Sequence, residues 1–231
     1  MTSPRWTWLG DLLGRFGIVA LFTMAASAKC GVIYKSAGEW AASSPDFELL
    51  RLLSEVANLA FLILIVATTI VRLKPLRSAE GLAPRLAALG GTFAMVFLVL
   101  TPPTVALSPT LNVFALCLTL VGFSLCVYVL YWLGRSFSIM AEARRLVTGG
   151  PYSIVRHPLY CVEEIAVIGV LLLHLSFLGM LIVAVQWALQ MRRMHNEERV
   201  LAEAFSTYGD YAARTPKFIP RLPAWPAQRS A

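Results

Sequence analysis

Two short polar stretches, residues 149–160 and 197–198, carry the side chains of this sequence that are best suited to chemistry. The first contains Arg156, His157 and Tyr160, and the second is a pair of glutamates. A guanidinium can bind a carboxylate in bidentate fashion, and a carboxylate accepts hydrogen bonds from hydroxyl or amino groups. Together these groups indicate a site that binds a charged, polar small molecule.

The residues between these stretches form two apolar runs, at about 159–175 and 177–194, that meet at a turn near Ser176. Arg156 lies 20 residues before Ser176, and Glu197 lies 21 residues after it. Since an α-helix rises about 1.5 Å per residue, two antiparallel helices would return both groups to one level, about 30 Å from the turn. We therefore predict a tight helical hairpin that brings the basic and acidic side chains together.

The first hairpin helix should begin at Pro158, because proline is favoured at the first helical position, and His157 should lie near its cap. Tyr160, Glu163 and Glu164 then fall in its first turn and a half, at i, i+3 and i, i+4 spacing. Two interpretations of the glutamates stay open. They complement the positive end of the helix dipole, or they contact a ligand.

A structural interpretation also exists for Arg156, as an ion pair with residues 197–198 that ties the open end of the hairpin. That interpretation leaves His157, Tyr160 and Tyr152 unexplained, although all three fall at the same membrane edge. Burying polar groups without partners there is costly. A bound polar ligand is therefore the favoured interpretation.

The composition predicts an all-α polytopic membrane protein, with 58% hydrophobic residues, 14% charged residues and a mean hydropathy of +0.68. The formal net charge is +7, but the basic residues are scattered at segment ends, which favours membrane lipids over nucleic acid as a partner. We expect about six membrane helices, comprising the two hairpin helices and four spans of about 20 or more residues. The spans are residues 12–34, 49–71, 84–107 and 110–134.

The positions of Lys and Arg predict the orientation, because cytoplasmic loops are enriched in them. All but three of the 20 Lys and Arg residues fall on one side, which places both termini and the polar site in the cytoplasm. Lys29, Glu55 and Asn58 lie within spans toward the opposite face, where an interhelical polar contact is their expected role. We expect residues 1–110 to be N-terminal membrane helices and residues 111–231 to form the core that carries the site.

The C-terminal segment is predicted to cover the site. Helical periodicity continues beyond Glu198 to Phe205, which indicates a cytoplasmic extension of the second hairpin helix. Residues 208–220 then combine prolines with alternating basic and aromatic residues, a pattern typical of an extended segment at a membrane surface. This tail would close the site from below.

Two other classes of site are disfavoured. Metal binding by His157, His195 and residues 197–198 lacks a ligand pair at helical spacing, and the four cysteines show no C-x-x-C spacing, so we assign no metal and no disulfide. A transporter or ion relay is the remaining alternative class. Transporters commonly repeat broken helices near the midplane, whereas this polar cluster lies at one edge and is not repeated.

Three motifs together resemble a known family. They are Gly-Pro-Tyr-x-x-Val-Arg-His-Pro-x-Tyr at 150–160, Glu-Glu-Arg-x-Leu at 197–201 and Tyr-x-x-Tyr-x-x-Arg-Thr-Pro-x-Phe-Ile-Pro at 208–220. This combination resembles the isoprenylcysteine carboxyl methyltransferases, their bacterial homologues and the related phospholipid methyltransferases. The resemblance covers about residues 130–222.

The resemblance implies an S-adenosylmethionine-dependent methyltransferase in the bacterial inner membrane. Its cofactor would lie in a cytoplasm-facing pocket formed by the last helices and the C-terminal segment, without a Rossmann domain. The cofactor-binding residues implied by the resemblance, with two plausible additions at 152 and 155, are Tyr152, Val155, Arg156, His157, Tyr160, Glu197 and Glu198.

The acceptor decides which residues are catalytic, since transfer from a sulfonium mainly requires that donor and nucleophile be held in line. A carboxylate acceptor needs no base, and Arg135 is our candidate for orienting it. An amine or alcohol needs a base, for which Glu163, Glu164 and Glu198 are candidates. We rank a prenyl-cysteine-like or other lipid carboxylate first, another small lipophilic amine or thiol second, and a phospholipid amine third.

Overall fold

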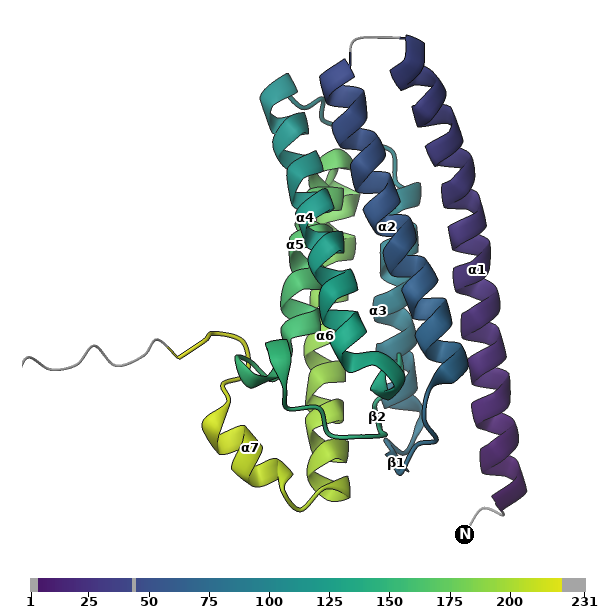
Figure 1. The fold of residues 1–231 in the computed structure, drawn as a ribbon, viewed down its shortest axis with the longest axis vertical. Coiled ribbons are helices and arrows are strands. Elements are labelled where there is room, and N and C mark those ends of the chain that lie inside the picture. Colours follow the sequence, from purple (N-terminus) through teal and green to yellow (C-terminus); the bar gives the residue numbers. More distant parts are fainter. Residues whose placement is uncertain (1–3, 43–44, 222–231) are drawn as a thin grey trace, which may run out of the picture.

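The computed structural model describes residues 4–42 and 45–221 of the chain. Its long helices, α1 to α6, run roughly along one direction (Figure 1), which confirms the predicted all-α architecture. The elements in chain order are α1 (Pro4–Ala42), α2 (Pro45–Val71), β1 (Arg77–Ser78), α3 (Leu82–Leu100), α4 (Pro109–Leu133), the 3₁₀ helix η1 (Gly134–Ser136), β2 (Glu142–Ala143), the 3₁₀ helix η2 (Gly150–Ser153), α5 (Pro158–Leu173), α6 (Phe177–Ala204) and α7 (Tyr208–Arg214).

Within the described residues, four helical segments are long and apolar enough to cross a membrane. They are Gly14–Gly38, Phe47–Val71, Leu82–Leu100 and Pro109–Ser136. The third ends earlier than predicted, because Pro102 and Pro103 cannot continue a helix. α5 has 16 residues, fewer than the about 20 that a span needs, and α6 carries Arg192 and Arg193 in its second half. Length and composition therefore support four of the six predicted membrane helices.

The hairpin of α5 and α6 has the predicted turn but not the predicted packing. At the turn, the Ser176 hydroxyl oxygen accepts a hydrogen bond from the Gly179 backbone N–H at 2.9 Å and so caps α6. The two helices then pack mainly against other helices, α5 against α4 and α6 against α3. The expectation of a tight hairpin is wrong in this respect, and a cavity lies between its arms.

Small residues explain why α5 packs against α4. A Cβ atom added at Gly122 of α4 would lie 2.4 Å from the Ala166 backbone nitrogen of α5, and one added at Gly169 of α5 would lie 2.5 Å from the Thr119 hydroxyl oxygen of α4. Glycines of this kind let two membrane helices approach closely along their backbones. The close contact with α4 therefore takes the face of α5 that would otherwise meet α6.

The predicted boundary between residues 1–110 and 111–231 lies next to the start of α4. Helices pack across it, since α2 contacts α4 and α3 contacts α6. The division into two parts stays a prediction. The packing itself makes α1, α2 and α3 part of the walls around the hairpin.

The loops at one end of the bundle are joined by a short two-stranded sheet. β1 pairs antiparallel with β2, with Arg77 opposite Ala143 and Ser78 opposite Glu142. This pairing ties the loop after α2 to the loop between α4 and α5. Figure 1 shows β1, β2 and α7 at the same end as the beginning of α5.

The C-terminal segment returns to this end and covers it, as predicted. The backbone N–H of Arg156 donates to the Pro216 carbonyl at 2.8 Å, and that of His157 donates to the Lys217 carbonyl at 3.3 Å. The cover is not extended throughout, because α7 forms its first part. The tail is thereby fixed beside the start of α5.

Candidate functional site

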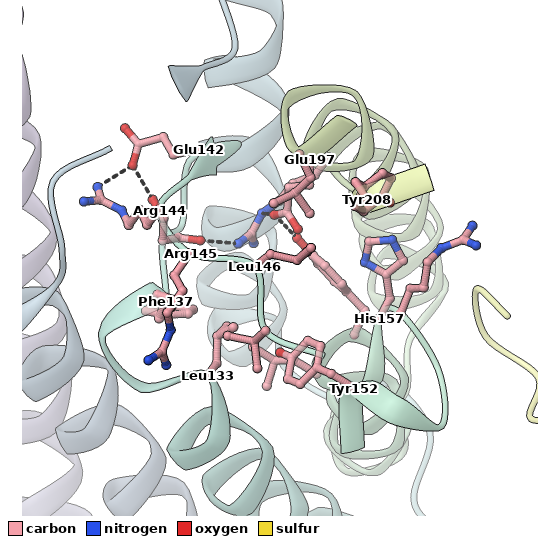
Figure 2. Close-up of a pocket in the computed structure, with 18 of the residues that line it drawn as sticks. Leu133, Phe137, Glu142, Arg144, Arg145, Leu146, Tyr152, His157, Glu197 and Tyr208 are labelled. Atoms are coloured by element: carbon pink, nitrogen blue, oxygen red, sulfur yellow. Dashed lines mark hydrogen bonds and ion pairs between the residues drawn. The ribbon is translucent and has the colours of Figure 1, made fainter. Parts of the chain in front are cut away.

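A pocket lies where α5 begins, beside the C-terminal half of α6 (Figure 2). We call it the site pocket; its empty volume is about 830 Å³, part of which is open to solvent. The loop between α4 and α5 forms one side, and α5, α6 and α7 contribute the others. The predicted cofactor residues that line it are Tyr152, Arg156, His157, Tyr160 and Glu197.

Glu198 gathers three basic side chains beside the pocket. Its Oε1 lies 3.0 Å from Arg156 Nε and 3.1 Å from His157 Nε2, and its Oε2 lies 3.2 Å from Lys217 Nζ. Burial raises the pKa of Glu198, but the hydrogen bond from His157 and the charges of His157, Lys217 and Arg156 outweigh it and lower the pKa to about 2. The carboxylate is therefore ionised at neutral pH. The basic and acidic stretches meet, as predicted.

Arg156 also holds the C-terminal segment. Its Nη1 donates to the Ala212 carbonyl at 2.8 Å and to the Thr215 carbonyl at 3.0 Å. The structural interpretation of the Arg156–Glu198 pair thus has a clear basis, although Arg156 lines the pocket as well. Glu198 and Val155 do not line the pocket, and Val155 is buried.

A second ionic cluster forms the pocket wall on α6. The Tyr160 hydroxyl donates to Glu197 Oε1, and Arg193 Nε lies 3.1 Å from the same oxygen. The Arg193 guanidinium lies over the Tyr160 ring, 5.2 Å from its centroid, and its Nη2 donates to the Ser138 carbonyl at 3.0 Å. Arg193 was not predicted as a site residue, although its i, i+4 spacing to Glu197 placed the two on one helix face.

Tyrosines supply neutral aromatic surface to the pocket. Burial, followed by the charge of Glu197, raises the pKa of Tyr152, and burial raises that of Tyr211 to about 12 despite the opposing charge of Arg156. The Tyr211 hydroxyl donates to the Tyr152 carbonyl at 2.7 Å, and the Tyr208 and Tyr211 rings meet edge to face at 6.1 Å. The phenols therefore remain uncharged at neutral pH and can face a cation.

The loop between α4 and α5 adds charged residues that the sequence analysis did not single out. Glu142 Oε2 accepts from the Ser138 hydroxyl at 2.6 Å and lies 2.5 Å from Arg144 Nη2 (Figure 2). Both Glu142 and Arg144 line the pocket, together with Arg145. The β1–β2 pairing brings this loop to the site, and no spacing in the sequence indicates that pairing.

Only some of the predicted catalytic residues line the pocket. Arg135 is outside the pocket lining, and its Nε donates to the Val71 carbonyl at the end of α2 at 2.9 Å. Glu164 accepts from Gln186 Nε2 at 3.4 Å and does not line the pocket. Glu163 does line it and accepts a hydrogen bond from Gln190 at 3.0 Å.

A larger space, here called the helix cavity, lies among α1 to α6. Its empty volume is about 1540 Å³, and most of its lining side chains are apolar, such as Phe22, Met95 and Val167. Glu163 and Arg193 line the helix cavity as well as the site pocket. These two residues therefore form a shared wall between a polar pocket and an apolar cavity.

Comparison with known proteins gives a match over the part of the chain that contains most of this site. Residues 104–208 match the family model described as phospholipid methyltransferase. Over 114 residues the chain is 37% identical to the cobalt-zinc-cadmium resistance protein CzcN of Cupriavidus metallidurans, which covers 49% of this chain and 49% of that protein. Over 82 residues it is 38% identical to the nickel-cobalt-cadmium resistance protein NccN of Alcaligenes xylosoxydans xylosoxydans, which covers 35% of this chain and 38% of that protein.

The matches to these two relatives span about half of their length or less. The family match is the more informative finding, because it runs from the loop before α4 through α5 and α6 to Tyr208. It thus includes Glu163, Arg193 and both polar stretches. Residues 104–208 of this chain are thus similar to the phospholipid methyltransferase family, which is part of the isoprenylcysteine carboxyl methyltransferase-like group that the motifs resemble.

Proposed function

We propose that this membrane protein transfers a methyl group from S-adenosylmethionine to a lipophilic acceptor, with the donor in the site pocket and the acceptor in the helix cavity. The observation that carries the proposal is the shared wall, since Glu163 and Arg193 line both spaces. A donor and an acceptor that meet at this wall need chiefly to be held in line for the reaction. The family match supplies independent support for methyl transfer.

The residues of the site pocket suit the donor. The Glu197 carboxylate can accept from ribose hydroxyls or an amino group. Arg156 uses Nε and Nη1 for Glu198 and the tail, and its guanidinium has further N–H donors for a carboxylate.

The aromatic rings of the pocket suit the positive charge of the donor. Tyr152 and Tyr211 line the pocket as neutral phenols, and the faces of such rings attract a sulfonium through the ring quadrupole. This attraction ends when the methyl group leaves, because the product is an uncharged thioether. The rings would therefore favour the donor over the product.

The acceptor that fits best is the carboxylate of a prenyl-cysteine-like or other lipid. The apolar helix cavity would hold its hydrocarbon part, and the Arg193 guanidinium at the shared wall would orient its carboxylate. A carboxylate oxygen forms the new O–CH₃ bond while the S–CH₃ bond breaks and its electron pair stays on sulfur, so no base is needed. Arg193 thus takes the role that the sequence analysis proposed for Arg135.

A second candidate is N-methylation of a phospholipid amine or of a small lipophilic amine, or S-methylation of a thiol. The description of the matching family favours a phospholipid, and Glu163 at the shared wall is a carboxylate that could remove a proton. An ammonium group must lose a proton to react as a neutral amine, and a thiol must lose one to react as a thiolate, so Glu163 would then be the general base. The two candidates differ in whether Glu163 is required.

The test is a transfer assay with methyl-labelled S-adenosylmethionine and purified protein in lipid vesicles. Label should enter N-acetyl-S-farnesyl-cysteine, and Arg193→Leu should lower the rate by about a hundredfold or more. The matched control is Arg199→Leu, because Arg199 lies on the same helix, is 75% exposed and pairs with Glu203 outside the pocket. The proposed function would be contradicted if no label entered the prenyl-cysteine, a phospholipid amine or a lipophilic thiol.

A further inference from the structure

We propose that an ion pair between α1 and α2, Lys29 with Glu55, limits the length of the hydrocarbon tail that the helix cavity accepts. The inference rests on the proposed function in one respect, that the cavity receives the acceptor's tail. Lys29 Nζ lies 2.6 Å from Glu55 Oε2, and the side chains are each 22% exposed. Lys29 lines the cavity, together with Asn58 of α2.

The pair lies toward the end of the cavity that is remote from the shared wall. α1 and α5 run in the same direction, from the end of the bundle that holds the site toward the opposite end (Figure 1). On α5 the cavity lining begins at Glu163, and on α1 it begins at Leu21 and includes Lys29. Eight residues of helix separate Leu21 from Lys29, which is a rise of about 12 Å. A tail that starts at the shared wall would meet the pair near the far end.

A charged group interrupts the apolar lining at this point, although Val32 of α1 lines the cavity one turn beyond Lys29. On the side of the pair that faces the shared wall, α1 contributes Leu21, Phe22 and Ala25, which offer hydrocarbon surface to a tail. At the pair, a tail would instead cover an ammonium and an amide and displace any water that solvates them. Removing solvent from charged groups without giving them new polar partners is unfavourable. Tails that end before they reach Lys29 avoid this cost, and longer tails incur it.

The residues that set this limit lie outside the segment that matches the family model. Lys29, Glu55 and Asn58 are in α1 and α2, whereas the family match begins at residue 104. The family segment would therefore supply the transfer chemistry, and the N-terminal helices would supply selection by tail length.

A purely structural role for the pair makes a different prediction. If Lys29 and Glu55 only tie α1 to α2, removing both charges changes the stability of the protein but leaves the preference among tails as it was. If the pair limits the tail, removing it raises the affinity for long tails specifically.

The experiment measures binding of N-acetyl-S-geranyl-cysteine, N-acetyl-S-farnesyl-cysteine and N-acetyl-S-geranylgeranyl-cysteine to the full chain by native mass spectrometry. The protein should bind the geranylgeranyl probe about tenfold or more weakly than the farnesyl probe. In the double variant Lys29→Leu/Glu55→Leu the difference should fall to about twofold or less. If the double variant does not fold, Lys29→Gln/Glu55→Gln removes the charges while retaining hydrogen-bonding groups.

The control is Arg77→Leu/Glu203→Leu, which removes a 2.7 Å ion pair that lines neither space. It should keep the preference of the unaltered protein. An unchanged preference in a folded variant without Lys29 and Glu55, or no discrimination between the probes by the unaltered protein, would overturn the inference. Labelled methyl transfer is measured separately, so that failure of transfer with an altered tail preference would count against the proposed function alone.

Discussion

Arg193 and Glu197 lie one turn apart on α6, with Nε and Oε1 separated by 3.1 Å, and this ion pair lies where the site pocket adjoins the helix cavity. Glu197 lines only the site pocket, whereas Arg193 lines both the site pocket and the helix cavity. The carboxylate thereby holds the guanidinium at the wall where a polar donor and an apolar acceptor could meet. This relationship links the ionic cluster to the proposed reaction.

Removing the Glu197 carboxylate is expected to weaken donor binding. In Glu197→Ala, titration calorimetry with S-adenosylhomocysteine should show affinity lowered by about tenfold to a hundredfold, because a charge-assisted hydrogen bond contributes about 1.5–3 kcal/mol. Arg156→Ala should lose binding as well, since it also releases the tail from Ala212 and Thr215. Affinity equal to that of the unaltered protein in both variants would remove these residues from the donor site.

Substitution of Glu163 distinguishes the two classes of acceptor. With a prenyl-cysteine carboxylate, Glu163→Gln should change kcat by less than about tenfold, because no proton is removed and Gln190 can still hydrogen-bond to the new amide. With an amine acceptor, kcat should fall by about a hundredfold or more. Rates measured side by side with both acceptors, and with Glu203→Gln as the control, decide between them. A large loss with the carboxylate acceptor would contradict the proposed role of Arg193.

The charge cluster around Glu198 predicts loss of stability in acid. Its pKa is lowered from 4.5 to about 2 in the folded protein, so the unfolded chain takes up the proton first as the pH falls. The stabilisation is present above about pH 4.5 and is lost as the pH falls toward about 2. Thermal unfolding in detergent should show this decline, and Glu198→Gln should be less stable near neutral pH but show a smaller decline. Equal acid dependence in both proteins would argue against a depressed pKa.

The α4–α5 contact is expected to depend on Gly122. Gly122→Ala places a Cβ atom 2.4 Å from the Ala166 backbone nitrogen, and separating the helices to accommodate it should cost about 1–3 kcal/mol of stability. The matched control is Gly17→Ala in α1, where nothing lies within 4 Å of the added atom. Thermal melts of the two variants give the comparison. A Gly122→Ala protein as stable as the Gly17→Ala protein would show that the contact is looser than described.

The sequence was sufficient to predict features that depend on neighbouring residues or on simple helical distances. Pro158 starts α5 with His157 at its cap, and the turn at Ser176 returns the chain so that Arg156 meets Glu198. These predictions needed only capping preferences and the rise of a helix. Four of the six predicted membrane helices followed in the same way from apolar length.

Features that depend on which helices pack together could not be predicted in this way. The splayed hairpin results from the fit of Gly122 against Ala166, which pairs residues of two helices that no local pattern connects. The same applies to Arg135, which lies next to η1 and binds the end of α2 rather than the pocket. Arg193 differs from these cases. It was not predicted, but it could have been, because its i, i+4 spacing to Glu197 was visible in the sequence.

The central claim is that donor and acceptor meet at Glu163 and Arg193. Its most direct test is the affinity of a compound that joins the two ligands. In this compound a short linker connects the sulfur of S-adenosylhomocysteine to a farnesyl chain. If the site pocket and the helix cavity communicate at this wall, the joined compound should bind at least about a hundredfold more tightly than S-adenosylhomocysteine, because the second part binds at high effective concentration. Calorimetry in detergent gives both affinities. Equal affinities for the two compounds would contradict the proposed arrangement.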